Sequence, residues 1–75
     1  MRRFFWDFSG GQAAGTAEHF RRHLDEFLGR EGIDGCKTGT EGYGPLHYAA
    51  WCDAPIAHSD AIIRSLRPRR VLDPE

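Results

Sequence analysis

The chain has 75 residues, a formal net charge of -1 at pH 7 and a hydrophobic share of 40%. A chain of this length forms one domain and buries only about 60% of the surface that it exposes when unfolded, so dimerisation would add to a small margin of stability. The 12% aromatic content excludes a disordered tail, and the near-neutral charge removes the general electrostatic reason to expect nucleic acid as a partner. We therefore expect residues 1–75 to form a single globular domain.

No targeting segment is recognisable near the amino terminus. The apolar run that follows Arg3 ends at Asp7, well short of the roughly 7–15 residues of a secretory core, and no window approaches the roughly 20 apolar residues of a membrane span. We expect a cytoplasmic protein with no membrane partner, in which Cys36 and Cys52 are small buried thiols. A disulfide between them would need an oxidising compartment.

The segment Arg2–Ser9 is rich in aromatic residues and is followed by two glycines, which predicts a strand. Its alternation predicts one face that meets a helix, carrying Phe4, Trp6 and Phe8. The other face, expected to look toward solvent or a partner, carries Arg3, Phe5, Asp7 and Ser9.

The segment Gly15–Arg30 has the clearest period in the chain and predicts an amphipathic helix. Its apolar stripe consists of Ala17, Phe20, Leu24, Phe27 and Leu28. Gly32 is the expected C-cap, whereas the sequence leaves open whether the helix starts near Gln12 or is capped by Thr16.

The link Gly10–Thr16 has the glycine spacing of a phosphate-binding loop, but it lacks the residues that such a loop uses. Thr16 stands where the lysine should be, and Ala17 stands where the magnesium-binding hydroxyl should be. We expect an ordinary connecting turn.

The segments Cys36–Thr40 and Leu46–Cys52 predict an antiparallel hairpin that turns within residues 42–45. In its second arm the expected inward residues are Leu46, Tyr48, Ala50 and Cys52, and the expected outward residues are His47, Ala49 and Trp51. A turn centred near Tyr43 or Gly44 would place Cys36 opposite or nearly opposite Cys52.

A second helix is predicted over about Pro55–Leu66, with Asp53 as its cap and Pro68 preventing its continuation. Its apolar line contains Ile62, Ile63 and Leu66. The run Arg69–Asp73 predicts a short edge strand whose arginines discourage pairing with another chain.

The predicted order of strand, helix, two strands, helix and strand resembles the ferredoxin-like fold, a βαββαβ sandwich. The resemblance implies a four-stranded antiparallel sheet with two helices on one face. It rests on order and length alone, and this fold serves too many activities to indicate a function.

The uncovered sheet face is the main candidate for binding. The predicted binding residues are Phe5, His47 and Trp51. Phe5 and Trp51 form an aromatic centre, and His47 lies around it with Asp7, Lys37 and Glu41. The alternative is that a loop or the carboxyl-terminal tail simply covers Trp51.

An RNA-binding version of this face fits less well. The segment EGYGPLHY, residues 41–48, follows part of the signature of RNA-recognition modules. However, Glu41 occupies the position of a basic residue and Pro45 that of a stacking aromatic, so we expect no nucleic-acid partner.

Metal binding and catalysis are the remaining alternatives. His19 and His23 are four residues apart and could chelate one ion, but a solvated helix face is the simpler interpretation, so we expect no metal site and no cofactor. His47 and His58 have no nucleophile and orienting partner apparent in the sequence, so we assign no catalytic residue.

These observations favour a binding module over an enzyme. We expect self-association, through the open sheet face or an edge strand, or a protein partner, with a small ligand as another candidate occupant of the face. The alternative is a small metal-handling protein or enzyme that uses histidine and cysteine side chains.

Overall fold

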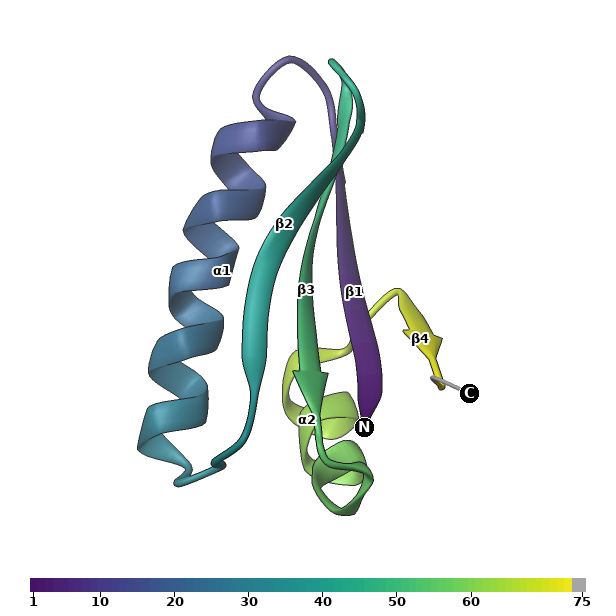
Figure 1. Cartoon of the computed structure of the whole chain (residues 1–75). Helices are drawn as coiled ribbons and strands as arrows, with labels where there is room; N and C mark the ends of the chain where they lie inside the picture. Colours follow the sequence, from purple (N-terminus) through teal and green to yellow (C-terminus); the bar gives the residue numbers. More distant parts are fainter. Residues whose placement is uncertain (74–75) are drawn as a thin grey trace.

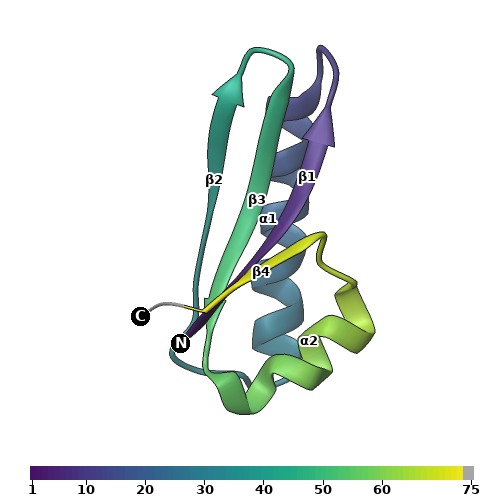
Figure 2. The same ribbon diagram turned by 90° about the vertical axis from the view of Figure 1, so that its right-hand side faces the viewer.

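The computed structural model describes residues 1–73. In chain order the elements are β1 (Arg2–Ser9), α1 (Ala13–Arg30), β2 (Lys37–Gly44), β3 (His47–Ala54), a 3-10 turn (Ile56–His58), α2 (Ser59–Leu66) and β4 (Arg70–Leu72). The strands form one antiparallel sheet in the order β2-β3-β1-β4. Both helices lie on the same face (Figure 1), and Figure 2 looks onto the other, open face. The predicted ferredoxin-like arrangement is confirmed.

The core lies between the helices and the sheet, as the alternation of β1 predicted. Phe4 and Trp6 point into it and are almost fully buried, while Phe8 packs at its margin. The predicted stripe of α1 faces them, and Ile62 of α2 completes the cluster. Among residues 1–73, no helix is long and apolar enough to cross a membrane.

The first helix begins at Ala13, after Gln12, and Thr16 is not its cap. Its carboxyl end forms a left-handed turn in which Gly32 has φ +67°, the Gly32 N–H donates to the Gly29 carbonyl, and the Ile33 N–H donates to the Leu28 carbonyl. This pair of bonds satisfies two carbonyls of the last turn and carries Ile33 back into the core.

The hairpin is longer than the sequence indicated. β2 continues to Gly44, with an irregularity between Gly42 and Gly44, and the turn consists of Pro45 and Leu46. The predicted turn position was therefore wrong. Proline has no backbone N–H to donate to a neighbouring strand, so the chain turns at Pro45, where no such hydrogen bond is needed. Leu46, expected to point inward, lies in this turn and is 61% exposed.

The two cysteines are nearly opposite each other, as predicted, but they are not direct partners. Thr38 is the partner of Cys52 in the strand register, and Cys36 lies two positions before Thr38, ahead of β2, where its side chain interacts with that of Cys52. Both cysteines are free, and burial raises the pKa of Cys52 to about 12. Cys52 is therefore an unreactive core residue at neutral pH.

The second helix differs from its prediction at the amino end. A 3-10 turn precedes α2, which begins at Ser59, and Asp53 does not cap it because Asp53 belongs to β3 and binds Arg3. At the other end, the Trp6 Nε1–H donates to the Leu66 carbonyl at 2.8 Å. This bond ties the last turn of α2 to the centre of the sheet.

Two glycine substitutions test the account of α1. A Cβ at Gly15 would meet nothing within 4 Å, so Gly15→Ala is expected to raise the free energy of unfolding by about 1 kcal/mol through helix propensity. Gly32→Ala places a side chain at positive φ and is expected to lower the free energy of unfolding by about 1–2 kcal/mol. Urea denaturation with an unchanged m-value measures both, and equal effects would contradict the assigned helix end.

Candidate binding surface

The strand register arranges the open face in three rows of side chains. The central row contains Gly39, Trp51, Phe5 and Arg70. The row on one side of it contains Lys37, Asp53, Arg3 and Leu72. The row on the other side contains Glu41, Ala49 and Asp7. Aromatic side chains thus occupy the middle of the face, with charged residues on both sides, as the sequence predicted.

Phe5 is covered by an arginine from β4. It points to the open face but is only 3% exposed, which corrects the expectation that it looks toward solvent. The Arg70 guanidinium stacks 4.2 Å from its ring centre and binds both carboxylate oxygens of Asp7, at 2.8 and 3.0 Å. The Arg70 hydrogen bonds, supported by His47, hold the pKa of Asp7 below its usual range, against the opposing effect of burial.

Trp51 lies in a second unit of the same kind. The Arg3 guanidinium sits 4.1 Å from the Trp51 ring centre and binds both oxygens of Asp53, at 2.6 and 2.8 Å. The indole leans over β2 at Gly39, where a Cβ would come within 2.6 Å of the ring. Gly39 is therefore needed for this position of the indole, and Trp51 remains partly exposed beside the β2 edge.

His47 stands apart from the aromatic centre. Its Nε2 lies 3.1 Å from Asp7 Oδ1, and its ring lies 4.8 Å from that of Tyr43. Tyr43 in turn accepts a hydrogen bond from Arg70 and donates one to Glu41, at 2.9 and 2.6 Å. The structure pairs Phe5 directly with Trp51, whereas His47 reaches them only through this polar network.

Most charges on the face are neutralised within the chain. Arg3 and Arg70 each have a carboxylate partner, so neither offers a free guanidinium to a phosphate. Two side chains of β2 differ: within residues 1–73, Lys37 and Glu41 take part in no ion pair. They have opposite signs and lie two residues on either side of Gly39.

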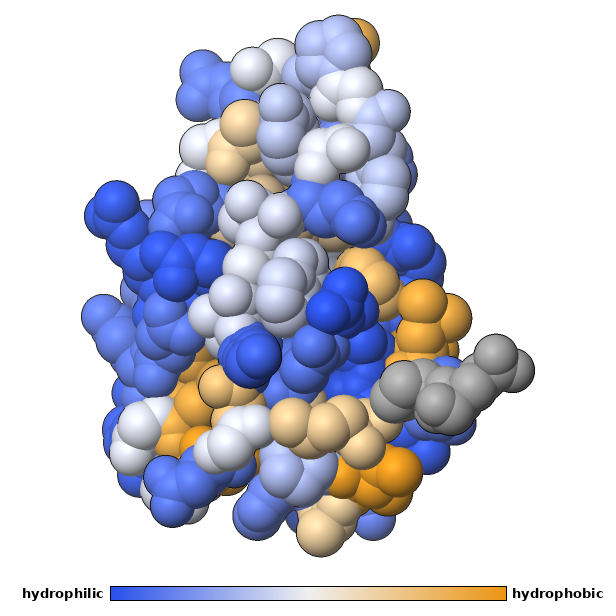
Figure 3. Space-filling model, in the orientation of Figure 1, coloured by the Kyte–Doolittle hydropathy of each residue, from blue (hydrophilic) through white to orange (hydrophobic). Residues whose placement is uncertain are grey.

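The outer edge of β2 is the second exposed feature of this region. β2 ends the strand order, so one side of its backbone has no neighbouring strand in the described sheet. Figure 3 shows this edge as a pale strip of glycine and threonine between blue, charged side chains. β1 is different, since β4 pairs with part of its second edge, from Arg3 to Phe5.

Sequence reasoning missed the roles of Arg70 and Tyr43. Arg70 was interpreted only as an edge residue that discourages pairing, and Tyr43 was placed in a turn. No local signal could have paired Arg70 with Asp7, because 63 positions separate them. In the part of the chain that is described, no group of three or more His, Cys, Asp and Glu side chains is placed to hold a metal ion.

Comparison with known proteins adds nothing to this geometry. No protein-family model, curated protein or solved structure matches the chain.

The Asp7 network predicts a specific acid sensitivity. A carboxyl whose pKa is lowered by folding stabilises the native state above its unfolded pKa, about 3.9, and this contribution is lost as the pH falls through the folded pKa. Asp7→Asn should therefore have a lower free energy of unfolding than the parent at neutral pH. Between about pH 5 and pH 2 its free energy of unfolding should fall by less than that of the parent. Urea denaturation across that range measures it, with the exposed loop variant Asp34→Asn as control. Parallel curves for parent and Asp7→Asn would contradict the assignment.

Proposed function

We propose that the protein is a self-associating binding module, in which two copies pair through the β2 edge and bring their Trp51 side chains together on the open face. The observation that carries the proposal is the sequence Lys37–Glu41, KTGTE, on the free edge of β2. It is complementary to itself in an antiparallel arrangement.

The register follows from a two-fold axis at Gly39. Antiparallel pairing about that residue sets Lys37 opposite Glu41 of the second copy, Thr38 opposite Thr40, and Gly39 opposite Gly39. Opposite charges and threonine pairs across neighbouring strands each contribute roughly 0.2–1 kcal/mol. Lys37 and Glu41, which take part in no ion pair within residues 1–73, would each gain an oppositely charged partner, and the two-fold axis would form this pair twice.

Trp51 supports the same axis from the neighbouring strand. It shares a row with Gly39 and leans over it toward the free edge. Pairing at Gly39 would leave two glycines between the two Trp51 residues, so the two indoles would approach each other above them. A two-fold interface needs such a self-complementary patch, and it would bury the exposed part of Trp51.

The charges also restrict the choice of partner. A charged edge strand resists pairing with an unrelated strand, because a lone Lys or Glu would face an uncharged residue. A second copy in this register would place an opposite charge beside Lys37 and beside Glu41. The same residues that prevent general aggregation would therefore favour self-association.

The cytoplasmic location expected from the sequence remains part of the proposal. Cys36 and Cys52 are both free thiols, the form that a reducing compartment maintains.

Charge reversal provides the sharpest test. Lys37→Glu or Glu41→Lys alone would put like charges opposite each other at two places in the dimer, weakening it by about 1–2 kcal/mol, or roughly 5- to 30-fold in Kd. The double variant Lys37→Glu, Glu41→Lys restores opposite charges and should recover the parent affinity. Sedimentation equilibrium at low salt measures the dissociation constants.

Matched controls make the same charge changes elsewhere. Arg64→Glu on α2 and Glu31→Lys after α1 lie away from the β2 edge and should leave the dimer unchanged. A monomeric parent, single variants that dimerise like the parent, or a double variant that stays weakened would each refute this register.

Truncation of Trp51 tests the role of the open face. Trp51→Ala should weaken dimerisation by roughly 2 kcal/mol or more, as expected when an aromatic side chain at the centre of an interface is truncated. The far-ultraviolet circular dichroism spectrum should stay unchanged. Leu72→Ala, which removes an exposed apolar residue at the opposite edge of the same face, is the control. A Trp51→Ala variant that keeps the parent's mass in native mass spectrometry would exclude Trp51 from the interface.

A further inference from the structure

Two histidines on α1 converge at one point in solvent. His19 and His23 lie one helical turn apart, and their Nε2 atoms are 3.0 Å from each other. The rings are nearly perpendicular, at 81°, with centres 4.5 Å apart. The two nitrogens are therefore within hydrogen-bond distance of each other, and the tautomers of the two rings decide which nitrogen donates.

The separation of the nitrogens matches two ligands of one metal ion. With metal–nitrogen bonds of about 2.0–2.1 Å, two nitrogens 3.0 Å apart subtend an angle of about 95° at the ion. This is close to the right angle between adjacent ligands in tetragonal and octahedral coordination, whereas a tetrahedral ion needs a wider separation of about 3.3–3.4 Å. Imidazole ligands in tetragonal geometry are typical of Cu²⁺ and Ni²⁺.

A carboxylate next to the pair favours the tautomer that binds metal. His23 Nδ1 lies 3.4 Å from Glu26 Oε1, one turn further along α1. A hydrogen on Nδ1 is attracted to this carboxylate, which leaves the Nε2 lone pair of His23 free for an ion. Histidine ligands in metal sites commonly have such a partner on their second nitrogen.

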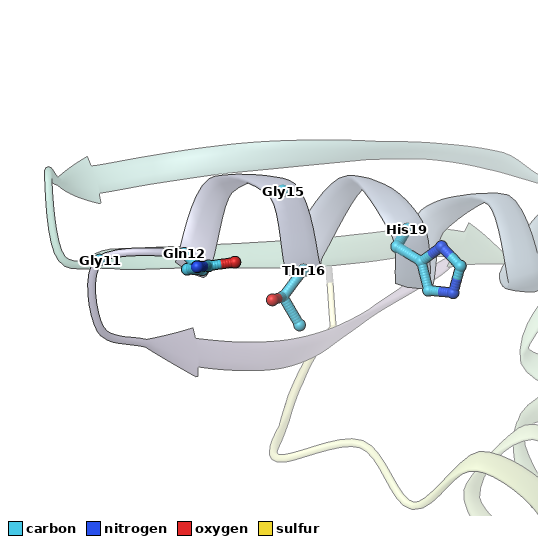
Figure 4. Close-up of a pocket in the computed structure, with 5 residues that line it drawn as sticks. All are labelled: Gly11, Gln12, Gly15, Thr16 and His19. Carbon is cyan, nitrogen blue, oxygen red and sulfur yellow. The ribbon is translucent and has the colours of Figure 1, made fainter.

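The surroundings of the pair leave space for further ligands, because His19 and His23 are both exposed. Water could therefore complete the coordination shell of an ion held by two protein ligands. A shallow hollow adjoins His19 on its amino-terminal side (Figure 4), lined by Gly11, Gln12, Gly15, Thr16 and His19, but His23 does not line it.

We infer that His19 and His23 form a surface site for one divalent transition-metal ion of the Cu²⁺ or Ni²⁺ type, with Glu26 positioning His23. His19 then carries its hydrogen on Nδ1, and the ion replaces the hydrogen between the two Nε2 atoms. The site is independent of the proposed dimer, because α1 lies on the helical face of the sheet and the histidines belong to a different flank of α1 from Asp25, which binds Thr38 of β2.

A titration of the full chain with Ni²⁺ tests the inference. Ni²⁺ is paramagnetic, so one bound ion per chain should broaden the ring-proton signals of His19 and His23 before those of His47 and His58. Isothermal titration calorimetry gives the affinity. Glu26→Gln should weaken binding by roughly tenfold, and His19→Ala or His23→Ala by at least as much. Mg²⁺, which prefers oxygen ligands, should produce no change.

The variants distinguish this site from other metal ligands. His58→Ala is the matched control and should bind like the parent, and the dimer should keep its dissociation constant in every variant. Broadening centred on Met1, Cys36 or His47, an affinity unchanged in His19→Ala, or no saturable binding would each overturn the inference. An unchanged affinity in Glu26→Gln alone would remove the positioning role of Glu26.

Discussion

The structure depends on one constraint, which is that β1 carries large aromatic side chains on both of its faces. Trp6 and Phe4 are covered in the usual way by helices, but Phe5 points to the face that no helix covers. An arginine solves this problem, since its planar guanidinium stacks on the ring while its N–H groups bind a carboxylate at the surface. Arg70 therefore removes Phe5 from water and presents polar atoms outward.

The same solution, repeated with Arg3 and Trp51, determines what the open face can do. Because each arginine is neutralised by its own aspartate, neither guanidinium is free to bind another anion. The charges without an ion pair within residues 1–73 lie instead at β2, where Lys37 and Glu41 are exposed beside the free backbone edge and Glu41 accepts a hydrogen bond from Tyr43. The proposed dimer would pair these charges between two copies and would bring the two Trp51 side chains into the same interface.

The first helix supplies a separate surface. Its apolar stripe is used in the core and the flank with Asp25 contacts β2, so the flank with His19 and His23 is free of both tasks. The pair in α1 is placed by helical spacing alone and needs no tertiary contact. The proposed metal site and the proposed dimer would therefore form independently of each other.

Periodicity in the sequence determined the order of the elements, the apolar stripe of α1 and the two faces of β1, because these depend on local backbone geometry. It also placed Phe5 and Trp51 on one face. Only the tertiary structure decided that Phe5 is buried, because its cover, Arg70, comes from β4 at the far end of the chain. The hairpin register, and with it the positions of Lys37 and Glu41 on the face, likewise depended on where the chain turned, and that turn lies only about two residues from its predicted position. A strand's side chains alternate with period two, so pairing partners are fixed only when the strands meet in space.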